Sequence, residues 1–287
     1  MTARPLVLLS NDDGVNAAGI RELAEALRVA CEVVVCAPEG EQSAQSHALT
    51  LSRPLRHRDL GGGVHAVDGS PADCIYVALH HTPILARRPD VVVSGMNHGV
   101  NLGSDVFYSG TVAAAREGAL RGIPAMAFSL ETGGDRAAAC VLAREMVLRL
   151  VVARAAPPTA DDVTPLLNVN FPLGIVRGVR ATRLGRRLYA DEVVVRHDPR
   201  GREYFWIGGP AGARHEPVDG SDTEAIDAGY ATITPLMIEA TSAAHLGLAA
   251  FVAGPAADAA PAADAAPSAD AAPAADAAPA GENGSAP

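Results

Sequence analysis

Short runs of apolar residues alternate with helical patterns along the first 170 residues, and this alternation constrains the fold most. Each run has the length and composition of a strand that is buried on both faces. The expected strands are residues 5–9, 32–36, 90–93, 125–128 and 166–170, and the expected helices are residues 20–27, 70–79, 111–120 and 136–155. Such an order predicts an α/β fold in which helices cover both faces of a mostly parallel sheet.

The pattern changes after residue 157. Residues 189–207 are typical of a β-hairpin that turns near residues 199–201. Residues 232–235 are expected to form a late strand, and an apolar, helical segment follows to about residue 252. We expect the hairpin element, at about residues 185–210, to project from the sheet and to serve oligomer contacts.

The C-terminal segment, residues 255–287, repeats every six residues. Proline recurs at positions 255, 261, 267, 273 and 279, aspartate recurs at positions 258, 264, 270 and 276, and the residues between them are almost all alanine. Closely spaced prolines prevent a continuous helix, and no large apolar side chain is available to bury. We therefore expect one domain over residues 1–254 and a disordered tail over residues 255–287.

Composition excludes several classes of protein. The net charge is -10 and no basic cluster stands out, which argues against the binding of long nucleic acids. No apolar run reaches the length of a membrane span, and the start of the chain lacks the apolar stretch of a secretion signal. Structural thiols in a reducing compartment explain the scattered cysteines most simply, so we expect a cytoplasmic protein; the cysteines are Cys31, Cys36, Cys74 and Cys140.

All 23 basic residues are arginine, so the chain contains no lysine. This excludes a Walker-type phosphate loop and Schiff-base chemistry, because both need a lysine. Any phosphate group must therefore be bound by backbone amides, hydroxyl groups, Asn side chains, arginine or a metal ion.

Two adjacent carboxylates, Asp12 and Asp13, follow the first expected strand directly and precede Gly14. Neighbouring like charges repel each other, and a divalent cation is the usual way to neutralise them. The motif alone could also be an ordinary loop with a helix cap. The pair therefore predicts a metal site with Asp12 and Asp13 as ligands, if further ligands lie close by.

Loops after two other expected strands supply such ligands. Ser43 follows the strand at residues 32–36, and Asn97 follows the strand at residues 90–93. Because the carboxyl ends of parallel strands meet at one edge of a sheet, we expect both side chains to lie near the aspartates. Two carboxylates, a hydroxyl and a carboxamide form an all-oxygen set, which Mg²⁺ and Mn²⁺ prefer. Taken singly, Ser43 and Asn97 could also be turn residues.

Small residues at the start of an alanine-rich helix predict a phosphate site beside this metal site. A helix start exposes free backbone N–H groups and the positive end of the helix dipole, and hydroxyl groups add donors. The expected phosphate-binding residues are Asn11, Asn101, Ser109, Gly110 and Thr111. A metal ion beside a bound phosphate indicates hydrolytic phosphoryl transfer. His47 and His98 lie near the same loops and could contact phosphate or a base, or hold the site in place.

Several of these motifs together resemble the SurE family. The resemblance covers residues 5–250 in order and is carried by Ser-Asn-Asp-Asp-Gly at 10–14, Gly-Ser-Pro-Ala-Asp-Cys at 69–74, Ser-Gly-Met-Asn-His-Gly-Val-Asn-Leu-Gly at 94–103, Tyr-Ser-Gly-Thr-Val at 108–112 and Tyr-Ala-Thr-Ile-Thr-Pro at 230–235. The resemblance implies a three-layer, Rossmann-like fold and a metal-dependent phosphomonoesterase that acts on nucleoside monophosphates. It also implies a cytoplasmic homodimer or homotetramer.

The resemblance assigns one divalent cation per subunit to the same four ligands, Asp12, Asp13, Ser43 and Asn97. We expect a water at this metal site to attack phosphorus, with Asp12 and Asp13 as the catalytic residues. The reaction is expected to be that of a 5′-nucleotidase, and activity on 3′-nucleotides or short polyphosphates stays open.

One departure from the family pattern bears on the substrate. Members commonly carry Ala-Pro-Asp followed by arginines before the ligand serine, whereas this chain has Glu39, Gly40 and Gln42 there. The change removes positive charge near the site and leaves the substrate preference open. A nucleotide- or metal-sensing module without turnover is the alternative function. A dinucleotide-dependent dehydrogenase is disfavoured, because no Gly-x-Gly-x-x-Gly follows the first strand.

Overall fold

The computed structural model describes residues 4–154, 163–189, 193–208 and 213–253. Internal contacts divide the chain into two compact units, Met1–Glu239 and Ala240–Pro287. The expected tail at residues 255–287 lies outside the described residues, so the tail and the domain boundary at residue 254 stay predictions.

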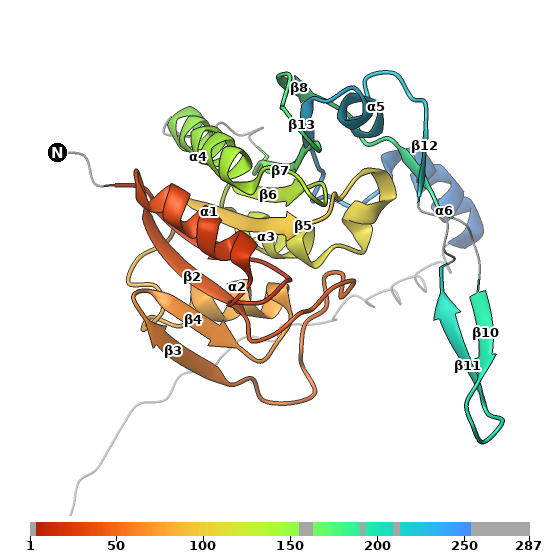
Figure 1. The fold of residues 1–287 in the computed structure, drawn as a ribbon, viewed down its shortest axis with the longest axis horizontal. Coiled ribbons are helices and arrows are strands. Elements are labelled where there is room, and N and C mark those ends of the chain that lie inside the picture. Colours follow the sequence, from red (N-terminus) through yellow and green to blue (C-terminus); the bar gives the residue numbers. More distant parts are fainter. Residues whose placement is uncertain (1–3, 155–162, 190–192, 209–212, 254–287) are drawn as a thin grey trace, which may run out of the picture. The chain divides into compact units, whose positions relative to one another are not determined.

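The first unit is organised by a sheet that has nine strands over the described residues, in the order β3-β4-β2-β1-β5-β6-β7-β13-β8 (Figure 1). Its strands are β1 (Leu6–Ser10), β2 (Glu32–Pro38), β3 (His57–Gly61), β4 (Val64–Val67), β5 (Val91–His98), β6 (Ala125–Leu130), β7 (Leu166–Phe171), β8 (Val179–Ala181) and β13 (Ala231–Pro235). The strands from β4 through β7 are parallel, whereas β3 runs antiparallel to β4 and β13 antiparallel to β7. The predicted mostly parallel sheet is confirmed.

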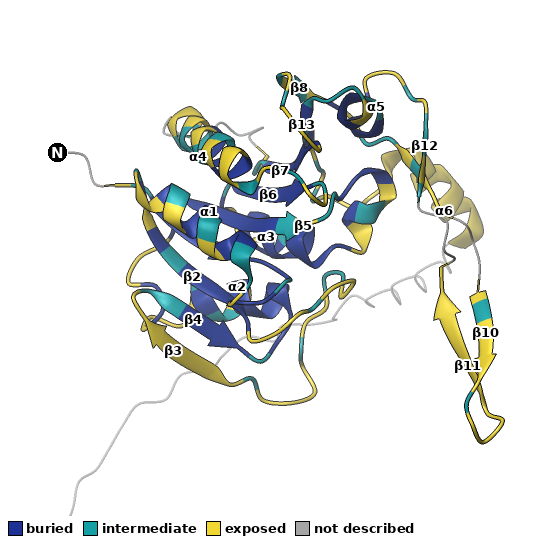
Figure 2. Cartoon of the chain, viewed as in Figure 1, coloured by how far each residue is buried: buried dark blue, intermediate teal, exposed yellow. Residues whose placement is uncertain are grey.

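Helices cover both faces of this sheet, which gives three layers (Figure 1). One face packs against α1 (Ala18–Arg28) and α4 (Arg136–Ala153), and the other packs against α2 (Pro71–His80) and α3 (Gly110–Leu120). Strand β1 serves both cores, because Val7 and Leu9 join the first one while Leu6 and Leu8 join the second. Strands β1 and β6 are buried from end to end, and β5 and β7 are buried over most of their length (Figure 2), as their apolar sequences predict.

The strands and helices expected from apolar periodicity are all present, with ends that differ by a few residues. Helix α2 begins as predicted, because the Ser70 hydroxyl accepts a hydrogen bond from the Asp73 N–H and Pro71 occupies the first turn. The edge strands β3 and β4 were not expected. Strand β3 reads His-Arg-Asp-Leu-Gly and all of its residues are exposed, so it lacks the apolar signal of a strand.

The hairpin region contains two pairs of antiparallel strands. In the sequence, the strands of one pair flank the strands of the other. Strands β10 (Val193–His197) and β11 (Glu203–Ile207) form the expected hairpin, and its turn is closed by a bond from Gly201 N to Asp198 O at 2.9 Å. Strands β9 (Arg186–Leu188) and β12 (Arg214–Glu216) pair outside it. Both pairs are separate from the nine-stranded sheet, and most residues of β10 and β11 are exposed (Figure 2).

Three further elements of this unit were not expected from the sequence. They are the 3-10 helix η1 (Gly103–Phe107), strand β8 and helix α5 (Asp222–Asp227). In the second unit, the described residues form η2 (Ala243–His245) and α6 (Leu246–Ala253), which confirms the apolar helical segment. None of the described helices combines the length and the apolar character needed to cross a membrane.

The order of the strands places a topological switch point between β1 and β5. From β1 the chain continues to β2 on one side of the sheet, and it later returns to β5 on the other side of β1. Connections that leave in opposite directions open a crevice beyond the carboxyl ends of these two strands, where α/β proteins bind their ligands. The loops after β1, β2 and β5 therefore face one crevice.

Candidate functional site

A cavity of about 820 Å³ lies at this switch point. The residues that line it are Asp12, Asp13, Glu41, Ser43, Ala44, Asn97, His98, Val100, Asn101, Asp105, Tyr108, Ser109, Arg187, Tyr189 and Ile207. The structure thus brings all four predicted metal ligands together, with two of the predicted phosphate-binding residues beside them. Asn11, Gly110 and Thr111 do not line the cavity.

Asp12 is the most buried carboxylate of the cavity, with 5% of its surface exposed. Burial raises its pKa to about 6, and the neighbouring charge of Asp13 adds to the shift. The Thr111 hydroxyl donates a hydrogen bond to Asp12 Oδ1, which opposes the shift and fixes the rotation of the carboxylate. When such a buried carboxylate is ionised, a positively charged partner stabilises it.

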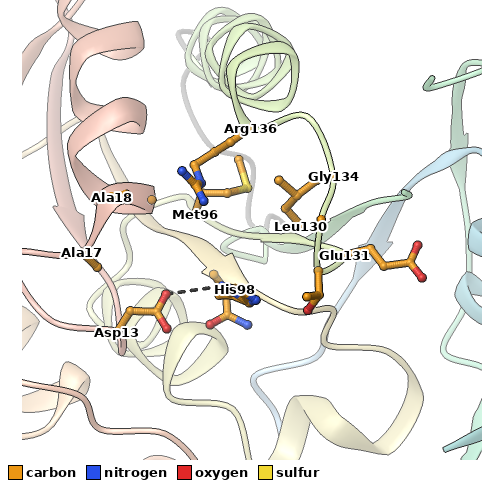
Figure 3. Close-up of a pocket in the computed structure, with 13 residues that line it drawn as sticks. Asp13, Ala17, Ala18, Met96, His98, Leu130, Glu131, Gly134 and Arg136 are labelled. Atoms are coloured by element: carbon orange, nitrogen blue, oxygen red, sulfur yellow. Dashed lines mark hydrogen bonds between the residues drawn. The ribbon is translucent and has the colours of Figure 1, made fainter. Parts of the chain in front are cut away.

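Asp13 is half-buried and lies beside His98. Its Oδ2 accepts a hydrogen bond from the backbone N–H of His98 at 3.3 Å, which links the β1 loop to the end of β5 (Figure 3). Burial raises the pKa of Asp13, against the opposing effect of that N–H and of the His98 charge. Gly14 completes the turn with a φ of +95°, and a Cβ there would lie 3.0 Å from the backbone of Gly40.

Ser43 and Asn97 present oxygen atoms from the β2 and β5 loops. The Ser43 hydroxyl donates to Glu41 Oε1 at 2.9 Å, so its lone pairs remain free to accept a cation. Asn97 Nδ2 donates to the Gly99 carbonyl at 2.8 Å. This bond leaves the carboxamide oxygen as the free end of the Asn97 side chain. Together with the carboxylates of Asp12 and Asp13, these oxygens fit a hard divalent cation.

Zinc-type ligation has no support here. Over the described part of the chain, no group of three or more His, Cys, Asp or Glu side chains is arranged to hold a metal ion. The donor set at the switch point has only two carboxylates, and its other members are neutral oxygens, which suit Mg²⁺ or Mn²⁺ rather than a soft metal.

The start of helix α3 lies directly against the carboxylates. Ser109 is the N-cap, and its hydroxyl accepts a hydrogen bond from Val112 N at 3.1 Å. At Gly110 a Cβ would lie 2.8 Å from Asp12 Cβ and 3.0 Å from Asp12 Oδ2, so only glycine permits this approach. Thr111 is fully buried, and its hydroxyl donates a hydrogen bond to Asp12. The helix start is therefore packed directly against Asp12, one of the predicted metal ligands.

Asn11 is also fully buried, and its side chain serves the β1 loop. Asn11 Nδ2 donates to the Gly14 carbonyl at 3.0 Å, which closes the turn that carries both aspartates. The carboxamide oxygen of Asn11 has no hydrogen-bond partner among the described residues. Its placement favours a role in shaping the loop over direct contact with a ligand.

Asn101 is held by a buried polar network on strands β6 and β7. Its backbone N–H donates to Asn170 Oδ1 at 2.7 Å, and its carbonyl accepts bonds from Asn168 Nδ2 at 2.8 Å and Asn170 Nδ2 at 3.1 Å. Asn101 Nδ2 donates to the Ser129 hydroxyl at 2.8 Å. These bonds orient the loop between β5 and α3, so the network sets where Asn101 meets a ligand.

A second buried carboxylate fastens this loop to the hairpin region. Asp222, at the start of α5, is fully buried. Its Oδ2 accepts a bond from Gly103 N at 3.0 Å and its Oδ1 accepts one from Gly185 N at 2.6 Å. Gly185 precedes β9, so Asp222 joins the wall that carries Asn101 to the wall that carries Arg187.

Several lining residues were not expected from the sequence. Arg187 Nη1 donates to Asp105 Oδ2 at 2.5 Å, and the Tyr189 hydroxyl donates to Asp105 Oδ1 at 2.7 Å. Arg187 Nε is buried and has no partner among the described residues. The other missed residues are Glu41, Ala44, Val100, Tyr108 and Ile207. Val100 and Tyr108 had a usable signal, because they lie inside the motifs at 94–103 and 108–112.

A smaller cavity of about 530 Å³ adjoins the first and shares Asp13, Asn97 and His98 with it. Figure 3 shows Asp13 and His98 on one side of this space, with Met96 and Arg136 across from them. His98 therefore lines both cavities. His47 lines neither, because it turns to Glu117 in helix α3, at 2.9 Å.

Fold and site together define a class: a three-layer α/β domain with an oxygen-lined cavity at the switch point of a mostly parallel sheet. Comparison with known proteins is more specific, because the family model "Survival protein SurE" matches residues 7–191. The chain belongs to the SurE family.

Relatives and a solved structure agree with this membership. The chain is 56% identical to "5'-nucleotidase SurE" of Sorangium cellulosum over 89% of its own length and 98% of that protein. It is 49% identical to a protein of the same name from an Anaeromyxobacter species, over 84% of its length and 92% of that protein. The crystal structure of the SurE protein from Aquifex aeolicus matches with a TM-score of 0.74 and 32% identity, over 87% of this chain and 100% of that one.

Proposed function

We propose that this protein is a metal-dependent 5′-nucleotidase that hydrolyses nucleoside monophosphates to a nucleoside and phosphate. The observation that carries the proposal is the convergence of Asp12, Asp13, Ser43 and Asn97 on one cavity, against the start of helix α3. The relatives named 5′-nucleotidase SurE, at 49% and 56% identity over most of the chain, support the reaction class.

In this proposal the oxygen atoms of Asp12, Asp13, Ser43 and Asn97 hold one Mg²⁺ or Mn²⁺ per subunit. The cation, when bound, supplies positive charge that offsets the negative charge building up at phosphorus during hydrolysis. The raised pKa of Asp12, about 6, supports this assignment, because a buried carboxylate with a like-charged neighbour is stabilised by a cation.

Phosphate binding falls to the cavity residues next to α3. The Ser109 side chain and the side chain of Asn101 donate to phosphate oxygens, while Gly110 keeps the helix start close to Asp12. Asn11 and Thr111 do not line the cavity and act indirectly. Asn11 shapes the β1 loop, and Thr111 fixes the rotation of the Asp12 carboxylate. Arg187 is the arginine of the cavity lining, so it takes the role that a lysine has in other phosphate sites.

Asp12 and Asp13 are the residues proposed to act on the reacting water. The Thr111 hydroxyl engages Asp12 Oδ1 and leaves Oδ2 to orient the water that attacks phosphorus. The His98 amide holds Asp13 at 3.3 Å, so the second carboxylate keeps its place beside the first. The two carboxylates therefore position the nucleophile and keep the site negative enough to retain a divalent cation.

We further propose a cytoplasmic homodimer or homotetramer. All four cysteines are free and buried, which suits a reducing compartment. Large apolar side chains on β10 and β11 are exposed, among them Val193, Phe205, Trp206 and Ile207. A cluster of this kind on one hairpin is typical of a protein–protein contact surface. Size-exclusion chromatography with light scattering should give a mass above that of one chain, and Trp206→Asp should lower it.

Phosphate release from 5′-AMP and 5′-GMP tests the proposed reaction. The purified full chain should release phosphate with Mn²⁺ or Mg²⁺ and should lose this activity in EDTA. Adding 3′-AMP and tripolyphosphate to the same panel ranks the other phosphate esters. Nucleotide binding without release across all substrates and metals would contradict the proposal and favour a sensor without turnover.

A further inference from the structure

Glu117 is a buried carboxylate that the proposed reaction does not use. It lies in helix α3 with 1% of its surface exposed, and two side chains reach it. His47 Nε2 lies 2.9 Å from Glu117 Oε2, and Arg121 reaches Oε1 through Nε at 2.9 Å and Nη2 at 2.7 Å. Burial opposes ionisation of Glu117, but the bonds from His47 and Arg121 outweigh it and lower the pKa. A charged group is thus kept inside the protein at a cost that its partners offset.

The loop that carries His47 also carries the metal ligand Ser43. Ser43, Ala44 and Gln45 are exposed, so apolar packing does not fix this part of the loop. Ala44 and Ser46 have φ values of 58° and 53°, and these are the non-glycine residues with positive φ over the described residues. Such a backbone is disfavoured for residues with a Cβ and persists only where the surroundings hold it.

Anchors on both sides of Ser43 hold the loop. Before it, Gln42 N donates to the Asp12 carbonyl at 2.7 Å. After it, the Ser46 hydroxyl donates to the Phe107 carbonyl at 2.6 Å, and His47 meets Glu117. The bond to Phe107 is exposed to solvent, whereas Glu117 is almost completely buried. The contact between His47 and Glu117 is therefore better protected from competition by water than the bond to Phe107.

Helix α3 begins at Gly110, against Asp12, and contains Glu117 further along. One rigid element thus touches the β1 carboxylates at its start and holds the Ser43 loop at its middle. We infer that Glu117, acting through His47, is a positioning residue that fixes Ser43 relative to Asp12 and so sets the affinity for the divalent cation. This inference rests on the proposed metal site and adds a role that contact with the cation does not require.

Binding of Mn²⁺ to the metal-free full chain, without substrate, tests the inference by electron paramagnetic resonance. His47→Ala removes the anchor, and we expect it to weaken Mn²⁺ binding about tenfold, the lower end of the usual effect of outer-shell residues. His47→Gln should bind Mn²⁺ within about twofold of the unchanged protein, because its amide can still donate to Glu117.

Arg121→Ala is the matched control. It removes the other partner of the same carboxylate and leaves the Ser43 loop in place, so Mn²⁺ affinity should stay within about twofold while the melting temperature falls. A purely structural role for Glu117 predicts the opposite pattern, in which His47→Ala and Arg121→Ala lower stability alike and both keep normal affinity. That pattern would overturn the inference.

Activity measurements separate this inference from the proposed reaction. In His47→Ala the Mn²⁺ concentration for half-maximal phosphate release should rise with the dissociation constant, while kcat at saturating Mn²⁺ stays within about twofold. If the unchanged protein binds Mn²⁺ but releases no phosphate, the proposed reaction is contradicted. The comparison of the His47 variants then still tests whether the His47–Glu117 contact sets Mn²⁺ affinity. If the unchanged protein binds no Mn²⁺, the metal site and the anchor both fail. Should His47→Ala not fold, His47→Ser replaces it, and affinity equal to that of His47→Gln overturns the inference.

Discussion

The two walls of the cavity are built in different ways. We call the residues on the strand ends and the start of α3 the sheet wall, and those on the hairpin region the arm wall; they are Asp12, Asp13, Asn97, Asn101 and Ser109 on the first, and Arg187, Tyr189 and Ile207 on the second. Asp12 is 5% exposed, whereas Tyr189 is 53% exposed and Ile207 is 93% exposed. The Asp12 carboxylate, proposed to act on the reacting water, is thus held by buried contacts, whereas Tyr189 and Ile207 lie on accessible chain.

The molecule thus divides its tasks between the two walls. A side chain held by packing and buried hydrogen bonds keeps the geometry that hydrolysis needs, but changing it disturbs the fold. A side chain on an exposed strand can change with little effect on folding, so recognition of different nucleotides can vary there. Changes on each wall should separate these two tasks.

The largest effect is expected on the sheet wall. Asp12→Asn should lower turnover at least about a hundredfold with the fold intact, because it removes a negative oxygen from the proposed ligands of the cation. Phosphate release from 5′-AMP with Mn²⁺ and circular dichroism measure the two parts. Asp59→Asn, on the exposed edge strand β3, is the control and should retain full activity. Near-normal turnover by Asp12→Asn would contradict the proposed role of the sheet wall in hydrolysis.

A second change tests whether the sheet wall depends on close packing. Gly110→Ala would place a Cβ 2.8 Å from Asp12 Cβ and must displace the helix start or the carboxylate. We expect kcat/KM to fall about tenfold or more, since small displacements of catalytic groups are costly. Gly40→Ala is the matched control, because nothing lies within 4 Å of its added Cβ. Equal activity of the two variants would contradict the close approach.

On the arm wall, the expected effect is smaller and of another kind. Arg187→Gln should raise KM for 5′-AMP about five- to tenfold and leave kcat within about twofold, which is the result of losing binding rather than chemistry. Steady-state kinetics at saturating Mn²⁺ measure both constants. Arg186→Gln is the control, because Arg186 is exposed and pairs with Glu216 at 3.3 Å. A loss of kcat comparable to that of Asp12→Asn would erase the distinction between the walls.

The smallest effect concerns stability and pH. In the metal-free protein the folded-state pKa of Asp12 is about 6, against an ordinary value of 3.8, so ionisation destabilises the folded state. This destabilisation is absent below about pH 4, grows as pH rises through 6, and amounts to about 3 kcal/mol at most.

Without metal at pH 7.5, Asp12→Asn should therefore melt several degrees higher than the unchanged protein, since it removes that destabilisation. The gap should close at pH 4 and also when Mn²⁺ is added to the unchanged protein. Differential scanning calorimetry in EDTA measures it. A lower melting temperature for Asp12→Asn at pH 7.5 would mean that its carboxylate stabilises the metal-free fold.

Much of the sheet wall was predictable because its signals are local. The apolar run of β1 ends directly at Asp12 and Asp13, and the parallel arrangement then brings Ser43 and Asn97 to the same edge. Contacts made at long range were not predictable. Thr111 was expected to meet phosphate, but its hydroxyl reaches Asp12, 99 residues away in the chain.

The arm wall escaped prediction for a physical reason. Its strands are short and exposed, so their sequences carry little of the apolar periodicity from which strands are identified. The hairpin of β10 and β11 was expected, but its enclosure by β9 and β12 depends on pairing between distant segments. Arg187 therefore had no local signal that placed it in the cavity.

Asp222 has a consequence for the order in which the protein is made. Its carboxylate joins the amides of Gly103 and Gly185, so it connects segments that leave the ribosome far apart in time. While the chain is being synthesised, the Gly103 N–H cannot bond to the Asp222 carboxylate until more than a hundred further residues have emerged. The nascent chain therefore completes its cavity only after Asp222 has emerged, and a product truncated before Asp222 would lack this fastening altogether.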